Sequence, residues 1–233
     1  MNKSIIIALD FETADLTLQF LDHLDPTLCR VKVGKELFTA AGPQLVKELV
    51  SREFDVFLDL KFHDIPNTVA RAVSVAADLG VWMLNVHTSG GRAMMESARE
   101  ALDRFGTDRP FIIGVTVLTS LVNEDLKEVG MLFQTEDQVS RLAFLARESG
   151  LDGVVCSAAE TKLLRTQLSD DFMLVTPGIR REEDVSGDQR RVVGPTEAIQ
   201  NGSNFLVIGR PITRADSPSD ALAEFNSAVS IVR

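Results

Sequence analysis

The sequence has few cysteines, a deficit of basic residues and no long apolar run, and each shortage excludes a class of protein. Among 233 residues, 24 are lysine or arginine and 34 are aspartate or glutamate, giving a formal net charge of -10 and a pI of about 4.8. Nucleic acid and anionic membranes require a basic face, so non-specific binding to either is not expected. An anionic ligand must therefore meet a local basic pocket.

The two cysteines, Cys29 and Cys156, are far apart and lie in apolar runs without CxxC spacing. This pattern predicts buried, reduced thiols rather than a disulfide framework, which suits the cytosol. The apolar run from Ile5 to Leu9 stops at Asp10 and is too short for a signal-peptide core or a membrane span. We therefore expect a soluble cytoplasmic protein.

Short β-branched runs recur along the whole chain. Their apolar character is continuous rather than alternating, which indicates strands covered on both faces, as in parallel sheets. Eight strands are predicted, at Ile5 to Leu9, Arg30 to Val33, Asp55 to Leu58, Trp82 to Val86, Phe111 to Val117, Gly153 to Cys156, Met173 to Val175 and Phe205 to Ile208.

Segments of helical periodicity lie between these strands. They run from Leu16 to Leu24, Gln44 to Leu49, Val69 to Leu79, Ala93 to Leu102, Gln138 to Glu148, Ala158 to Leu168 and Ala221 to Ile231. Prolines are predicted to begin the first turn of three helices and glycines to follow the end of three, namely Pro43, Pro66 and Pro195, and Gly80, Gly150 and Gly202.

The alternation of strand and helix indicates an α/β fold, a (β/α)₈ TIM barrel formed as one domain by residues 1–233. The length and the 45% hydrophobic content suit one large core. A doubly wound open sheet is the structural alternative. However, Asp10-Phe11-Glu12-Thr13 follows the first strand where a dinucleotide fold would place a Gly-x-Gly-x-x-Gly turn.

Charged residues fall at the ends of the first three predicted strands. In a barrel the carboxyl ends of all strands meet at one face, so Asp10, Lys32, Asp59, Lys61 and Asp64 are predicted to share one pocket of alternating charge. Carboxylate neighbours favour the charged form of a lysine, so Lys61 is predicted to be a general acid rather than a nucleophilic amine. A structural ring of ion pairs closing the barrel mouth is the alternative interpretation.

The loops after the seventh and eighth strands have a different chemistry. Gly178, Gly209 and Arg210 lie where barrels of this class bind phosphate. Glycine lets phosphate oxygens approach backbone N–H groups, and arginine adds charge-assisted hydrogen bonds. Taken alone, Gly209 and Arg210 would be interpreted as a strand end with a surface arginine.

Two further features border the predicted pocket. The polar segment of residues 180–191 is predicted to be a mobile lid, with Arg180 and Gln189 best placed to reach a substrate. His63 and His87 lack the spacing of a metal motif and are interpreted as residues that pack beside the site.

The segment from Asp59 to Thr68, Asp-Leu-Lys-Phe-His-Asp-Ile-Pro-Asn-Thr, resembles the signature of the orotidine 5′-monophosphate decarboxylases, in particular their bacterial branch. The resemblance extends over essentially the whole chain. It includes Ala8 to Asp10, Val31 to Gly34, Thr116 to Ser120, Thr176 to Arg180 and Ile208 to Pro211.

The resemblance implies decarboxylation of orotidine 5′-monophosphate to UMP and carbon dioxide in pyrimidine biosynthesis, without a cofactor or metal. It implies that Lys61 donates the proton, with Asp59 and Asp64 on either side. Asp10 and Lys32 would hold the ribose, and Lys32 would extend the charged array.

The resemblance also assigns the remaining contacts to the nucleotide. Within the chain these are Thr119, Ser120, Pro177, Arg180, Gln189, Gly209 and Arg210. It further implies a homodimer with shared active sites, in which Asp64, Ile65 and Thr68 reach the adjoining subunit.

Two rival functions remain. A magnesium-dependent sugar-phosphate decarboxylase on a related barrel resembles the same Asp-x-Lys-x-x-Asp pattern, but it would need an acidic ligand on the second strand, where this chain has Lys32. A barrel that binds nucleotides without chemistry is the other. Release of carbon dioxide from orotidylate would separate all three.

Overall fold

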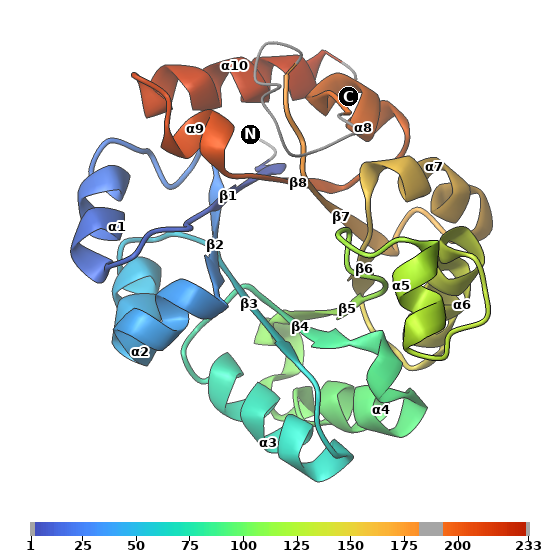
Figure 1. Cartoon of the computed structure of the whole chain (residues 1–233). Helices are drawn as coiled ribbons and strands as arrows, with labels where there is room; N and C mark the ends of the chain where they lie inside the picture. The colour runs from blue at the N-terminus through green and yellow to red at the C-terminus, as the bar shows by residue number, and fades with distance from the viewer. Residues whose placement is uncertain (1–2, 182–192, 232–233) are drawn as a thin grey trace.

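A closed barrel of parallel strands forms the centre of the molecule (Figure 1). The computed structural model describes residues 3–181 and 193–231. Within these ranges the strands follow one another around the barrel in chain order, and β1 pairs with β8 to close it. The strands are β1 (Ile5–Ala8), β2 (Arg30–Gly34), β3 (Val56–Phe62), β4 (Met83–His87), β5 (Phe111–Val115), β6 (Gly153–Val155), β7 (Met173–Pro177) and β8 (Phe205–Ile208). The predicted barrel is confirmed, and the open sheet is wrong.

Helices surround the barrel and cover the outer face of its strands (Figure 1). The α-helices are α1 (Ala14–Leu21), α2 (Lys35–Ser51), α3 (Pro66–Ala77), α4 (Arg92–Glu100), α5 (Asn123–Glu128), α6 (Thr135–Glu148), α7 (Ala158–Gln167), α8 (Pro195–Gln200), α9 (Arg210–Thr213) and α10 (Pro218–Ser230). Two 3₁₀ turns, η1 (Thr88–Gly90) and η2 (Asp103–Asp108), flank α4. No helix in the described part of the chain is long and apolar enough to cross a membrane.

The predicted helix boundaries are confirmed at most prolines and glycines. Pro66 and Pro195 occupy the first turns of α3 and α8, where a missing N–H costs nothing. Gly80, Gly150 and Gly202 follow helix ends with positive φ angles. Pro43 differs, because it lies inside α2, which begins at Lys35; Gly42 breaks that helix with φ 68°, so Pro43 begins only its second half.

Alternate residues along each strand point into the barrel, because successive side chains lie on opposite faces. The inward positions form a small apolar layer of Ile6, Ala8, Phe57, Met83, Ile113, Val175 and Val207. The intervening residues, such as Ile5, Ile7 and Leu58, join the larger core between the strands and the helices.

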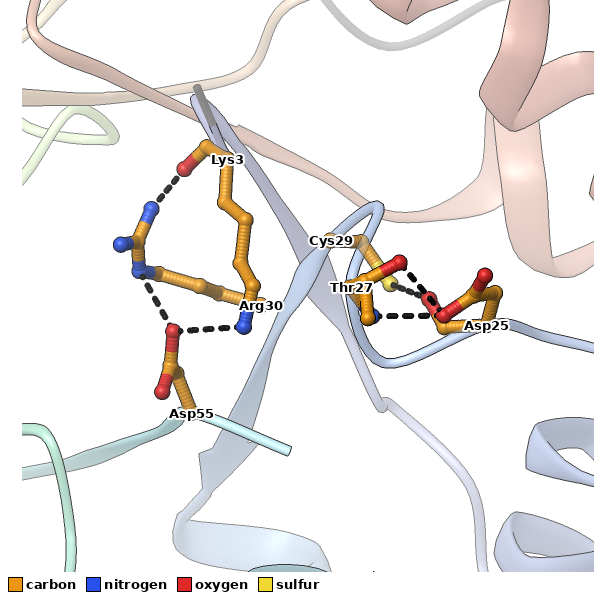
Figure 2. Close-up of polar contacts among 6 residues, drawn as sticks. All are labelled: Lys3, Asp25, Thr27, Cys29, Arg30 and Asp55. Carbon is orange, nitrogen blue, oxygen red and sulfur yellow. Dashed lines mark hydrogen bonds and ion pairs between the residues drawn. The ribbon is translucent and has the colours of Figure 1, made fainter. Parts of the chain in front are cut away.

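The amino end of the barrel is closed by Arg30 beneath this apolar layer. Its guanidinium stacks 4.2 Å from the ring centroid of Trp82 and 5.0 Å from that of Phe205. Figure 2 shows the same guanidinium pairing with Asp55, at 3.3 Å, and donating to the carbonyl oxygen of Lys3. The ammonium of Lys3 also reaches Asp55, at 3.0 Å. This network fills the amino end of the barrel with protein side chains.

Both cysteines are buried and free, as the sequence predicts. Burial raises the pKa of Cys29 and of Cys156 to about 12, because the thiolate would lie in apolar surroundings. Cys29 lies beside Asp25 (Figure 2), and its thiol is 3.9 Å from the Asp25 carbonyl oxygen.

Candidate active site

The inward positions change from apolar to charged toward the carboxyl ends of the strands. Asp10 lies two residues after Ala8, and Asp59 lies two residues after Phe57. The two-residue period of a strand therefore carries both carboxylates to the same side as the apolar layer. Lys32, the middle residue of β2, points inward in the same way, between the outward Val31 and Val33.

These side chains form a continuous charged chain. The ammonium of Lys32 lies 3.6 Å from Asp10 Oδ1 and 3.3 Å from Asp59 Oδ2. The other carboxylate oxygen of Asp59 accepts a hydrogen bond of 2.7 Å from Lys61 Nζ. Only 12% of the Asp59 and Lys32 side chains and 25% of Lys61 are exposed, so water screens these charges less than surface pairs.

The backbone of β3 is irregular where it carries Lys61. Leu58 pairs with Leu84, but the next pair in the ladder is Phe62 with Val86, so three residues of β3 face only Asn85 of β4. Lys61 has a φ of 53°, in the left-handed region that non-glycine residues rarely adopt. Its displaced N–H donates to the side-chain oxygen of Asn85 at 2.8 Å. The bulge thus places Lys61 over the mouth of the barrel.

A cavity of about 330 Å³ opens at this end of the barrel. Its floor is apolar and includes Phe57, Val115, Val155 and Val207. An apolar floor with a few convergent polar groups is typical of a small-molecule site. Its polar and loop lining brings together Asp10, Lys32, Asp59, Lys61, Thr119, Pro177, Gly178, Arg180, Gly209 and Arg210.

Two histidines lie beside the charged chain. Their ring centroids, in His63 and His87, are 5.5 Å apart. Burial lowers the pKa of His87, and the charges of His63, Lys35 and Lys61 act in the same direction, against a weaker opposing effect of Asp59. Over residues 3–181 and 193–231, no three His, Cys, Asp or Glu side chains are grouped as metal ligands.

Comparison with known proteins identifies the family. Residues 3–225 match the family model described as "Orotidine 5'-phosphate decarboxylase / HUMPS family". The chain belongs to this family. It is 56% identical over 230 residues to the orotidine 5′-phosphate decarboxylase of Shewanella sediminis, covering 99% of this chain and 98% of that protein. The Haemophilus ducreyi enzyme of the same name is also 56% identical, with 99% and 100% covered.

Solved structures agree with the barrel. The orotidine 5′-phosphate decarboxylase of Lactobacillus acidophilus superposes with a TM-score of 0.88 at 37% identity, covering 97% of this chain and 99% of that one. The protein of that name from Pyrococcus horikoshii OT3 has a TM-score of 0.79 at 20% identity, with 97% and 99% covered, and shows the shared fold alone.

Not every residue expected at the site lies there within one chain. The prediction that Asp64 joins the other four charges is wrong for a single chain, because Asp64 is exposed, does not line the cavity, and its Oδ1 accepts from the Ile65 N–H at 2.6 Å. Ile65, 67% exposed, and Thr68 also lie outside the cavity. These residues come after the end of β3 at Phe62, where the chain enters helix α3.

Two other expected residues, Ser120 and Gln189, have different outcomes, and Thr116, in the same segment as Ser120, has a structural role. Ser120 is exposed and does not line the cavity, although its neighbour Thr119 does. Thr116 is buried and donates to the Val155 carbonyl at 3.0 Å, so it bridges two strands. Gln189 and the rest of the predicted lid beyond Arg181 lie outside the described residues.

Asn85 is the site residue that sequence reasoning missed. It is fully buried, and its side chain contacts both Asp59 and the backbone of Lys61. A signal was present: a lone amide lies within the apolar run of β4, two residues after the inward Met83. Asn85 lies in the middle of β4 and not at its end, where polar residues indicate a barrel site.

Proposed function

We propose that the chain decarboxylates orotidine 5′-monophosphate to UMP and carbon dioxide, with Lys61 as the proton donor. Family membership and relatives 56% identical over nearly the whole chain carry the reaction itself. The observation that carries the role of Lys61 is the chain of Lys32, Asp59 and Lys61 at the cavity, with 3.3 Å and 2.7 Å between their charged atoms.

The chemistry requires electrostatic help, because the ring cannot delocalise the charge that forms. The bond from the ring to the carboxylate breaks, carbon dioxide leaves, and the electron pair stays on the ring carbon in the plane of the ring. The ammonium of Lys61 stabilises this developing charge and then gives its proton to the same carbon. Asp59 orients that ammonium, and solvent returns a proton to Lys61 before the next turnover.

The remaining lining residues are proposed to hold the nucleotide. Asp10 and Lys32 contact the ribose hydroxyls, while Gly209 and Arg210, which follow the neighbouring strand β8, receive the phosphate. Thr119, Ser120 and Pro177 border the pyrimidine, and Arg180 and Gln189 contact the nucleotide from the segment after β7. The cavity lining supports these roles for all but Ser120 and Gln189. Phosphate binding far from the reacting carbon can contribute to catalysis by closing the site.

We propose that the active sites are shared in a two-fold homodimer. Asp64 does not reach the cavity of its own chain, and Ile65 exposes 67% of its surface beside it. Val75, on helix α3, which begins directly after Ile65, is 64% exposed. A partner covering this surface would bury apolar area and take Asp64, Ile65 and Thr68 into its own site.

Neither a cofactor nor a metal enters the proposed reaction, and nucleic acid and membranes are not proposed as partners. The family model covers both the orotidine 5′-phosphate decarboxylases and the HUMPS group. The relatives that are 56% identical to this chain are named as decarboxylases, and they favour that reaction. Against the magnesium-dependent sugar-phosphate rival, the inward residue of β2 is the cation Lys32, 3.3 Å from Asp59, where a metal would need an anion. We propose a cytoplasmic location, which the two free buried thiols support because they suit a reducing compartment.

The test is the ultraviolet absorbance change as purified protein converts orotidylate to UMP. We expect turnover that is unchanged after treatment with a chelator. Turnover lost on chelation and restored by magnesium would support the sugar-phosphate rival. Binding of orotidylate without release of carbon dioxide would support the non-catalytic barrel.

A further inference from the structure

Asn85 lies in the middle of β4, directly beneath the charged chain. We propose that it is a positioning residue that fixes Asp59 and Lys61 relative to each other for the reaction proposed above. Its side chain is fully buried and does not line the cavity. It therefore acts through the two residues that it holds rather than by touching the nucleotide.

The first function of Asn85 is to complete the interrupted ladder between β3 and β4. Three residues of β3 lie opposite this single residue of β4, so the Lys61 N–H has left the regular pairing. The Asn85 oxygen accepts that N–H at 2.8 Å. Because Lys61 has a φ of 53°, a conformation unfavourable for a side chain with a Cβ, the bond stabilises the bulge that aims the lysine.

The second function is to fix the carboxylate that orients Lys61. Asn85 Nδ2 donates to Asp59 Oδ1 at 2.7 Å, and this same oxygen accepts from Lys61 Nζ at 2.7 Å. Lys32 Nζ lies 3.3 Å from the other oxygen. The side-chain oxygen of Asn85 thus binds the backbone of Lys61, and its nitrogen binds Asp59, the carboxylate that pairs with the Lys61 ammonium.

The chemistry of the two partners determines which way the amide points. A backbone N–H can only donate, and an ionised carboxylate can only accept, so one end must be oxygen and the other nitrogen. No apolar residue can make either bond. A carboxylic acid can make both while it is protonated, and loses the donor when it ionises.

The surroundings make the loss of these bonds costly. Asn85 lies one inward position above the buried Met83 and beside Ile113 of β5, so water cannot replace the missing partner. The charged or titratable groups that face it are Asp59 and Lys61 on β3, with Lys32 on β2 and His87 further along β4.

The experiment compares Asn85→Leu and Asn85→Asp with Thr176→Val. The control removes a buried hydrogen bond of 2.7 Å to Ser203, on residues that do not line the cavity. Circular dichroism and thermal unfolding establish which variants fold. Steady-state decarboxylation of orotidylate then gives kcat and KM for each.

We expect Asn85→Leu to lower kcat by about 100-fold with a much smaller change in KM, as for a misplaced catalytic group. Thr176→Val should remain within about threefold of wild type in both, the size of change for a small loss of binding or stability. Equal kcat for Asn85→Leu and Thr176→Val, or a rise in KM alone, would overturn the proposal.

Asn85→Asp tests the same idea by pH and decides the matter if Asn85→Leu does not fold. Protonated, the introduced carboxyl can donate to Asp59 and accept from Lys61; ionised, it repels Asp59. The ratio of variant to wild-type kcat should therefore rise about tenfold between pH 8 and pH 5, as for one protonation-dependent contact. A flat ratio refutes positioning. Failure of the proposed function is separate, because it would show as absent turnover in wild type or retained turnover in Lys61→Ala.

Discussion

The ammonium of Lys61 lies 2.7 Å from Asp59 Oδ1, and the two residues are separated by a single position on the same strand. In a regular strand both side chains would project in parallel from the same face. The left-handed backbone at Lys61 departs from that geometry, and the ammonium closes onto the carboxylate. Removing either group therefore leaves a partly buried charge without its main partner.

Lys61→Ala should abolish nearly all turnover of orotidylate while the barrel remains folded. The lysine supplies the proton and stabilises the carbanion, and losing such a group typically costs about 10²–10⁴-fold in rate. Asp59→Asn should also be severe, because it frees both Lys61 and Lys32 from an orienting charge. Steady-state kinetics with circular dichroism as the folding check would measure both. Lys162→Ala, an exposed lysine on α7, is the control that should keep wild-type kcat.

Arg210→Ala should weaken binding of the nucleotide far more than binding of the nucleoside orotidine. A charge-assisted contact to phosphate is worth about 1.5–3 kcal/mol, and orotidine cannot make it. The measurement is kcat/KM for the two substrates, with Arg214→Ala as control, since Arg214 is an exposed arginine of the same turn that does not line the cavity. An equal loss with both substrates would refute the phosphate role.

The thermal stability of the protein should fall as the pH drops below about 6.5, in part because of His87. Burial lowers the pKa of His87 below its usual 6.5, so the unfolded chain takes up a proton in this range before the folded one does. The free energy of unfolding then decreases as the pH falls, and above pH 6.5 this contribution is constant. His87→Gln should show a smaller loss of Tm across the range, whereas His23→Gln, an exposed site, should follow wild type. Identical curves for the His87 variant and wild type would contradict this.

The barrel could be predicted because its strands are short, apolar and separated by helices with recognisable ends. The predicted strand ends at Leu58 because the polar residues Asp59 and Lys61 interrupt the apolar run. In the structure β3 continues to Phe62. From Asp59 to Phe62, polar and apolar residues alternate, because the polar side chains line the active site and the apolar ones pack on the other face of the strand. The short helices α5 and α9 were missed, because a few residues carry no measurable periodicity.

The charged residues of the site could be anticipated, but their arrangement could not. The bulge at Lys61 depends on the register between β3 and β4, which is a property of two segments paired in space. The lone amide in β4 marks Asn85 as unusual, but its contacts with Asp59 and Lys61 depend on that register. The position of Asp64 outside its own cavity likewise depends on where the chain turns after the bulge.

The shared active site can be tested by mixing two inactive proteins. Lys61→Ala lacks the proton donor, and Asp64→Asn lacks the carboxylate proposed to reach across the dimer. Subunits of the two variants are allowed to exchange, and the exchange is verified by mass spectrometry. Each variant alone, treated in the same way, is the control and should remain inactive.

In a heterodimer of these variants, one site collects both defects, but the other takes Lys61 from one chain and Asp64 from its partner. That second site is wild type. Random pairing makes half of the dimers mixed, each with one intact site of two, so activity should return to about 25% of wild type under closed two-fold pairing. If Asp64 instead served the Lys61 of its own chain, every site in every dimer would keep a defect. Verified exchange with no recovered activity would therefore exclude the shared site, even with decarboxylation by the wild-type protein established.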